Sequence, residues 1–97
     1  RTHCNDKVVE YLLDLVDATR AEPRLTQGAS PRASSGLMHL ARAHAVVTGR
    51  DYVTPDDIQA VFVGALAHRV TVGGRVDTAA AAEVLSWLVT QVPVPRP

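Results

Sequence analysis

Three features are missing from this sequence: a phosphate-binding loop, a long hydrophobic run and a second cysteine. The loop Gly-x-x-x-x-Gly-Lys-Ser/Thr needs a lysine, and the single lysine among the 97 residues, Lys7, lies between Asp6 and Val8. These residues alone therefore cannot hydrolyse a nucleoside triphosphate. Cys4 has no partner for an internal disulfide, which favours a reducing compartment such as the cytoplasm. No apolar run approaches the roughly 20 residues that span a bilayer, and no signal-peptide pattern is present.

The chain also has no net charge at pH 7, because ten basic residues balance ten acidic ones. No long-range field of one sign would draw the chain onto nucleic acid or an anionic membrane, so a nucleic-acid partner is not expected. Apolar residues make up 46% of the chain and charged residues 21%, as in ordinary globular domains. We expect one compact domain over residues 1–97, and its start at Arg1 suggests a fragment of a larger protein.

Helical periodicity is present in four segments, which predicts an all-α fold built as a four-helix bundle. The residues expected on the buried faces of the successive helices are Val8, Val9, Leu12, Leu13, Leu15 and Val16; Leu37, Leu40, Ala41, His44 and Val47; Ile58, Val61, Phe62, Ala65 and Leu66; and Ala81, Val84, Leu85, Leu88 and Val92. Gly36 lies inside the second helix, where it costs up to about 1 kcal/mol relative to Ala unless close packing compensates.

Capping residues set the predicted helix boundaries. Asn5 or Asp6 can cap the first helix, and Asp77 lies at the start of the fourth. Ser30 followed by Pro31 predicts an N-cap and first position for the second helix, and Thr54-Pro55-Asp56-Asp57 repeats this pattern for the third. The segment 24–29 is predicted to be a connecting loop. The alternation over Val70–Val76 around two glycines is compatible with a small hairpin.

The histidines do not form a recognisable metal or catalytic pattern. His39 and His44 are five residues apart, whereas two ligands on one helix face lie four apart, and no set of four zinc ligands has suitable spacing. No Gly-x-Ser-x-Gly nucleophile motif occurs. We therefore predict no metal site and no catalytic residue in this chain, although a metal-dependent enzyme that uses the histidines remains an alternative to test by metal content.

Arg32 is the residue most suggestive of binding. It lies at the predicted start of the second helix, where a cation meets the partial positive charge of the helix end, an unfavourable contact of a few tenths of a kcal/mol. An anion at that end would reverse the effect, because backbone N–H groups and the guanidinium could bind one phosphate. The simpler interpretation is an arginine that points into water.

Four segments together resemble, in order and spacing, the C-terminal lid of MoxR-type AAA+ ATPases. They are Ala18-Thr19-Arg20, Gly28-Ala29-Ser30-Pro31-Arg32-Ala33, Gly49-Arg50-Asp51-Tyr52-Val53-Thr54-Pro55-Asp56-Asp57-Ile58 and Leu66-Ala67-His68-Arg69. The resemblance extends from about Val8 to Pro95. It is weaker between Arg69 and Val84, so the Gly73-Gly74 segment is not clearly a family feature.

The resemblance implies that Arg32 is the sensor-2 arginine, which contacts the terminal phosphates of ATP bound to a preceding P-loop core, and that Ser30 caps the helix that carries it. ATP and Mg²⁺ would be cofactors of the parent protein and would not bind to this fragment alone. The implied partners are the core of the same chain, neighbouring subunits of a ring, which the resemblance implies to be a hexamer, and proteins with von Willebrand factor A domains. The parent would be a cytoplasmic, chaperone-like remodeler that helps metal- or cofactor-containing enzymes to mature.

A different class of function is also open: a stand-alone helical module that binds a protein or nucleic acid. A natural polypeptide that begins at or near Arg1 would favour this alternative. A P-loop encoded upstream would favour the lid.

Overall fold

The computed structural model describes residues 5–95 and confirms the all-α fold. Its four helices are α1 (Asp6–Ala21), α2 (Ala33–Val47), α3 (Pro55–Leu66) and α4 (Thr78–Gln91). Two short strands, β1 (Leu25–Gln27) and β2 (Thr71–Val72), form a small sheet. Within the described residues, no helix combines the length and the hydropathy needed to cross a bilayer.

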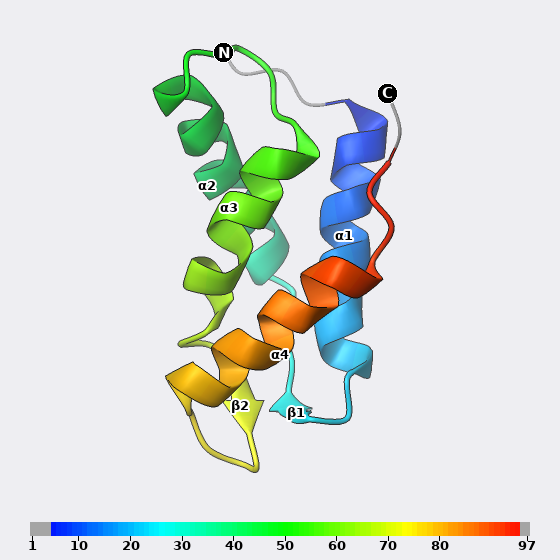
Figure 1. The fold of residues 1–97 in the computed structure, drawn as a ribbon, viewed down its shortest axis with the longest axis vertical. Coiled ribbons are helices and arrows are strands. Elements are labelled where there is room, and N and C mark those ends of the chain that lie inside the picture. The colour runs from blue at the N-terminus through cyan, green and yellow to red at the C-terminus, as the bar shows by residue number, and fades with distance from the viewer. Residues whose placement is uncertain (1–4, 96–97) are drawn as a thin grey trace.

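The helices pack around one core (Figure 1). α2 and α3 run antiparallel beside each other, α1 lies on the other side of the molecule, and α4 crosses obliquely over α1 and α3. The two strands lie together at the end of the molecule where α4 begins. Among the largest side chains of the core are Tyr11, Phe62, Leu37 and Leu85, which are almost fully buried. Each helix therefore contributes at least one large apolar residue to the same core.

Side-chain caps begin three of the helices, as the sequence predicts. The carboxamide oxygen of Asn5 accepts a hydrogen bond from Val8 N at 3.0 Å, and the Asp77 carboxylate accepts one from Ala80 N at 3.1 Å. Thr54 and Asp57 form a capping box at the start of α3, which begins with Pro55 at its first position. These bonds satisfy backbone N–H groups that have no partner inside the helix.

The buried faces of α1 and α2 differ from the prediction. Leu13 and Leu40 are each 43% exposed and Val47 is 85% exposed, whereas Tyr11 and Thr19 are buried. In α2, the buried positions recur every fourth residue, and three of them are alanines, which allow close approach of a neighbouring helix. The buried positions of α2 are Ala33, Leu37, Ala41 and Ala45. The predicted spacing is correct for Leu37 and Ala41 but wrong for Leu40 and Val47, because Ala33 and Ala45 complete the buried face instead.

The prediction of a loop at residues 24–29 is wrong in part, because this segment contains the strand β1. Leu25 pairs with Val72 in an antiparallel register, so β1 lies in that segment. Around Gly73 and Gly74, which have φ values of +62° and +80°, the chain turns back and Val72 N donates a hydrogen bond to Arg75 O at 2.8 Å. The predicted turn over Val70–Val76 is therefore present, but the strand that pairs with it comes from the connection between α1 and α2.

Candidate functional site

The connection between α1 and α2 is bound to the last turn of α1. Thr19 is buried, and its hydroxyl donates to Val16 O at 2.6 Å and accepts from Ala29 N at 3.0 Å. Arg20 Nε donates to Ala29 O at 2.9 Å. Both polar backbone groups of Ala29 are thus held by side chains from α1, just before the start of α2.

Gly28 completes this arrangement because its backbone lies against α1. A Cβ atom at position 28 would be 2.6 Å from Thr19 O and 2.8 Å from the Arg20 Cα, distances too short for any side chain. We call Thr19, Arg20, Gly28 and Ala29 the α1–α2 clamp. The clamp fixes the backbone three residues before Arg32, so it determines where α2 begins.

Arg32 occupies the N-cap position of α2 and is exposed. Among residues 5–95, its side chain makes no hydrogen bond or ion pair. It lines a hollow of about 250 Å³ together with Arg69, which follows α3. The hollow's lining residues are Arg32, Ala33, Gly36, Leu40, Ala65, Leu66 and Arg69, and we call it the arginine hollow. The structure therefore brings Arg32 together with a second arginine, for which the sequence alone indicates no chemical role.

Ser30 does not cap α2 with its side chain, contrary to the prediction. Pro31 and Arg32 form a turn before the helix, and Ala33 N donates to the backbone carbonyl of Ser30 at 3.0 Å. In the predicted arrangement, the Ser30 hydroxyl would have accepted a hydrogen bond from this part of the first turn. Because the carbonyl of Ser30 takes the Ala33 N–H, the support that Ser30 gives to Arg32 comes from its backbone.

Gly36 is not explained by close packing. A Cβ atom at this position would meet no atom within 4 Å, so no neighbouring element packs closely enough to compensate for the cost of this glycine. Gly36 instead lines the arginine hollow, and its missing side chain leaves that part of the hollow open.

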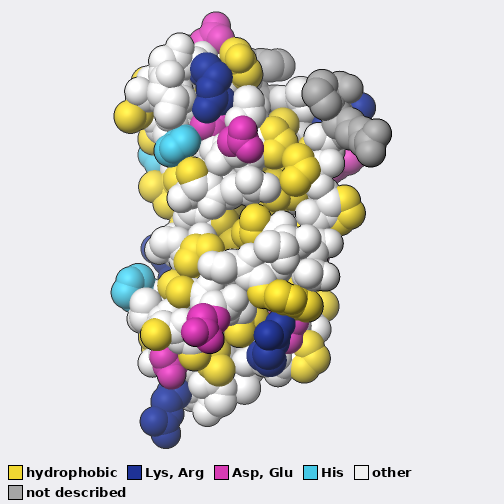
Figure 2. Space-filling view, viewed as in Figure 1, with side chains coloured by type: hydrophobic (Ala, Val, Ile, Leu, Met, Phe, Trp, Pro, Cys, Tyr) yellow, Lys and Arg dark blue, Asp and Glu magenta, His cyan; other side chains and the backbone are white. Residues whose placement is uncertain are grey.

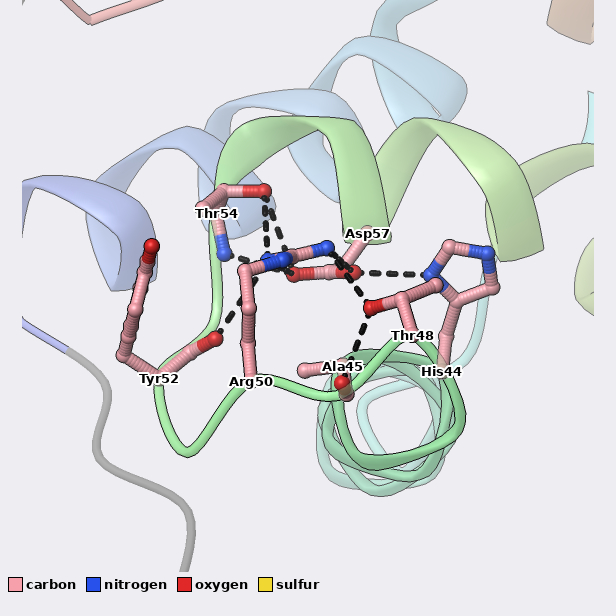
Figure 3. Close-up of polar contacts among 7 residues, drawn as sticks. All are labelled: His44, Ala45, Thr48, Arg50, Tyr52, Thr54 and Asp57. Carbon is pink, nitrogen blue, oxygen red and sulfur yellow. Dashed lines mark hydrogen bonds and ion pairs between the residues drawn. The ribbon is translucent and has the colours of Figure 1, made fainter.

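A second polar cluster joins the other ends of α2 and α3 (Figure 3). The guanidinium of Arg50 donates two hydrogen bonds to the carboxylate of Asp57, both 2.7 Å long. His44 Nδ1 lies 2.7 Å from Asp57 Oδ1, and Thr54 N donates to Oδ2 at 2.7 Å. Arg50 also donates to the Thr48 hydroxyl at 3.0 Å. We call these residues the Asp57 network, and it connects the C-terminal end of α2 to the N-terminal end of α3.

Asp57 is ionised in this network although it is completely buried. Burial by itself would raise the pKa of the Asp57 carboxyl, but hydrogen bonds from Arg50, Thr54 and His44 hold that pKa well below its ordinary value. Both carboxylate oxygens accept hydrogen bonds from this chain, and the side chain has no solvent-exposed surface that a substrate could reach. The network therefore acts as a structural joint between the two helices.

The lowered pKa of Asp57 gives a pH dependence with a defined sign. An acid with a lower pKa in the folded state stabilises the fold above the unfolded-state pKa of about 4, and this contribution is lost as pH falls through the folded-state pKa. We expect the free energy of unfolding to decrease below about pH 4, and the decrease to be smaller in Asp57→Asn. Urea denaturation between pH 2 and 7 measures this. Equal acid sensitivity of the two proteins would assign the effect to other carboxylates.

The remaining histidines do not form a site in the described residues. His39 is exposed, and His68 Nδ1 lies 3.3 Å from the Thr78 hydroxyl. Over residues 5–95, no group of three His, Cys, Asp or Glu side chains is arranged to hold a metal ion. His3 and Cys4, which are adjacent in the sequence, lie outside the described residues.

Charged side chains of both signs are interspersed on the face drawn in Figure 2. Lys and Arg side chains lie beside Asp and Glu side chains at both ends of that face. Arg24 illustrates the pattern, because it forms an ion pair with Glu22 and stacks 4.4 Å from the centre of the Trp87 ring. This face has no continuous basic surface of the kind that binds a nucleic-acid backbone.

The model of the AAA lid domain family matches residues 17–86, a range that contains the α1–α2 clamp, the arginine hollow and the Asp57 network. The chain belongs to this family. Relatives with the MoxR name identify it more closely as a C-terminal lid of the MoxR type. The segments that suggested the resemblance contain the clamp residues, the two arginines of the hollow, and Arg50 and Asp57 of the network.

Two curated relatives and one crystal structure illustrate the similarity. The uncharacterised protein YeaC of Bacillus subtilis is 44% identical over 66 residues, which are 68% of this chain and 21% of YeaC. The chaperone MoxR1 of Mycobacterium tuberculosis is 42% identical over 72 residues, 65% of this chain and 19% of MoxR1. The crystal structure of a candidate ATPase from Cytophaga hutchinsonii superposes with a TM-score of 0.85 at 27% identity, covering 98% of this chain and 32% of the other. This lid thus spans about a fifth of the length of the two curated relatives.

Proposed function

We propose that this lid closes over ATP bound to a P-loop core in the same polypeptide, and that Arg32 contacts the terminal phosphates as a sensor-2 residue. The observation that carries the proposal is the position of Arg32: it is exposed at the first turn of α2, it has no partner within residues 5–95, and the clamp fixes the chain just before it. A guanidinium held at a helix start is suited to a phosphate, because it adds planar, charge-assisted hydrogen bonds to the positive end of the helix.

The chemistry of hydrolysis belongs to the core in this proposal. A P-loop and a Mg²⁺ ion would hold the triphosphate there, and this domain would supply one cation and exclude water by closing. The Asp57 network supports the closing movement, because it joins α2 to α3 so that both helices move together. The domain would thereby couple the state of the nucleotide to the position of the whole lid.

The parent protein would be a cytoplasmic ATPase that assembles as a ring, a hexamer by family resemblance, and remodels client enzymes with von Willebrand factor A proteins. Support for this wider proposal comes from the similarity to MoxR1, a protein named as a chaperone. The length of the relatives also supports it, since about four fifths of each of the two lies outside the part that matches this chain.

Replacing Arg32 with alanine in the ATPase that contains this domain tests the proposal. One or two charge-assisted hydrogen bonds would be lost, so we expect kcat/KM for ATP to decrease at least about tenfold. Steady-state phosphate release measures the change, and circular dichroism should show an unaltered fold because Arg32 is exposed and lies outside the buried core.

Arg42→Ala is the matched control. Arg42 lies on the same helix, is exposed and makes no side-chain hydrogen bond or ion pair in the described residues, but it lies outside the arginine hollow. Its removal should leave ATP turnover unchanged. If Arg32→Ala and Arg42→Ala hydrolyse ATP at the wild-type rate, the sensor-2 assignment is wrong.

A further inference from the structure

The start of α2 and the end of α3 lie at the same end of the antiparallel helix pair (Figure 1). Arg32 precedes α2 by one residue and Arg69 follows the last residue of α3, Leu66, by three. The fold therefore brings two arginines that are distant in sequence to the walls of one hollow. The two arginines line the same hollow because α2 and α3 pack against each other. No direct bond joins their side chains within residues 5–95.

The charges in this hollow are unbalanced. No aspartate or glutamate is among its lining residues, and neither guanidinium has a hydrogen-bonded partner within residues 5–95. Three other arginines are paired, Arg20 with Asp17, Arg24 with Glu22 and Arg50 with Asp57, whereas Arg42 and Arg75 are single exposed cations outside the hollow. Two unpaired cations that line one hollow repel each other, and an anion bound between them would be attracted to both.

The rest of the lining leaves room for such an anion. It consists of small and apolar residues, including Ala33, Gly36 and Ala65, and the Cβ position of Gly36 has no neighbour within 4 Å. An apolar wall lowers the local polarity, which strengthens hydrogen bonds between a guanidinium and an anion. The volume of about 250 Å³ exceeds what a single phosphate group needs, so the hollow can hold part of a phosphate chain.

We infer that Arg69 is a second phosphate-binding residue of the lid, and that Arg32 and Arg69 bind the phosphate chain of the nucleotide from opposite sides of the arginine hollow. The inference rests on the proposed function, because it requires the nucleotide to lie against this end of α2. It goes beyond that function by assigning two cations to the phosphates. Nucleoside triphosphates carry several negative charges, so two guanidiniums neutralise them better than one.

The experiment measures the affinity of the ATPase containing this lid for the slowly hydrolysed analogue ATPγS, in the presence of Mg²⁺. We expect Arg69→Ala to weaken binding about tenfold, the equivalent of one charge-assisted contact, and Arg69→Lys to restore part of the affinity because the charge returns without the planar geometry. Arg75→Ala is the control, since Arg75 is exposed and outside the hollow. It should bind like wild type.

A second variant tests the hollow without removing a charge. Gly36→Leu keeps the helix and fills the open space, so it should weaken ATPγS binding by a similar factor. Gly64→Leu is its match, because Gly64 is also exposed within a helix and also has no atom within 4 Å of its Cβ position. Gly64→Leu should not change the affinity.

The outcomes separate this inference from the proposed function. If Arg32→Ala slows turnover but Arg69→Ala and Gly36→Leu bind ATPγS normally, Arg69 is not a phosphate ligand and the sensor-2 proposal stands. Loss of ring assembly in Arg69→Ala with unchanged nucleotide affinity, measured by size-exclusion chromatography, would place Arg69 at a subunit contact and also overturn the inference. If neither arginine affects nucleotide binding or turnover, both proposals are wrong.

Discussion

Asp57→Ala is expected to lower the free energy of unfolding by about 3 kcal/mol, because it removes the centre of a buried polar network. The substitution deletes both hydrogen bonds from Arg50, the contact with His44 and the cap on Thr54 N. The side chain of Arg50 is only 25% exposed, so its charge would lose a partner without gaining full hydration. Urea denaturation of the 97-residue chain, followed by circular dichroism, measures the change.

Asp56→Ala provides the comparison from the neighbouring position. Asp56 is also in the first turn of α3, but it is exposed and makes no hydrogen bond in the described residues. Its removal should cost mainly the interaction with the helix dipole, roughly 0.3 to 1 kcal/mol, together with a weak attraction to Arg50. If the two substitutions destabilise the chain equally, the network contributes little beyond the helix-start charge.

Gly28→Ala should also destabilise the chain by about 3 kcal/mol, at the upper end of the cost of overpacking. The new methyl group would lie 2.6 Å from a backbone oxygen of α1, which cannot rotate away as a flexible side chain could. Relief of this contact requires the connection to move away from α1. That movement would break the hydrogen bonds that Thr19 and Arg20 make with Ala29.

Gly64→Ala serves as the reference for Gly28→Ala. Gly64 lies in α3 with open space at its Cβ position, so alanine should be neutral or stabilising by up to about 1 kcal/mol. The same denaturation measurement applies to both variants. A wild-type midpoint for Gly28→Ala would mean that the clamp is looser than its distances indicate. In the full ATPase, Gly28→Ala should also reduce turnover, because Arg32 follows the clamp.

Local signals allowed much of the fold to be predicted from the sequence. Asn5, Thr54 and Asp77 each cap a helix within three residues of themselves, so their chemistry is visible in a short window. The four helices and the turn at Gly73-Gly74 were predictable for the same reason. The family resemblance was predictable because its segments are also short and keep their order.

Features that depend on contacts between distant segments could not be predicted. The pairing of Leu25 with Val72 requires knowledge of how α1 and α3 end in space. Asp57 was expected as a helix-start carboxylate, but its bond to Arg50 depends on the path of the loop between α2 and α3. Arg69 joins Arg32 only because the two helices are antiparallel. Local sequence gives no measure of that proximity.

The two ends of the α2–α3 pair are constrained differently. The pair can therefore act as a lever that transmits a movement from one end of the domain to the other. The Asp57 network binds one end tightly, while the other end presents two unpaired arginines. α2 has 15 residues and is therefore about 22 Å long. If α2 moves as a rigid rod, a tilt of about 5° imposed at the arginine end displaces the Asp57 end by about 2 Å. The gain or loss of one phosphate group at the arginine end would thus displace the Asp57 end, on the far side of the domain.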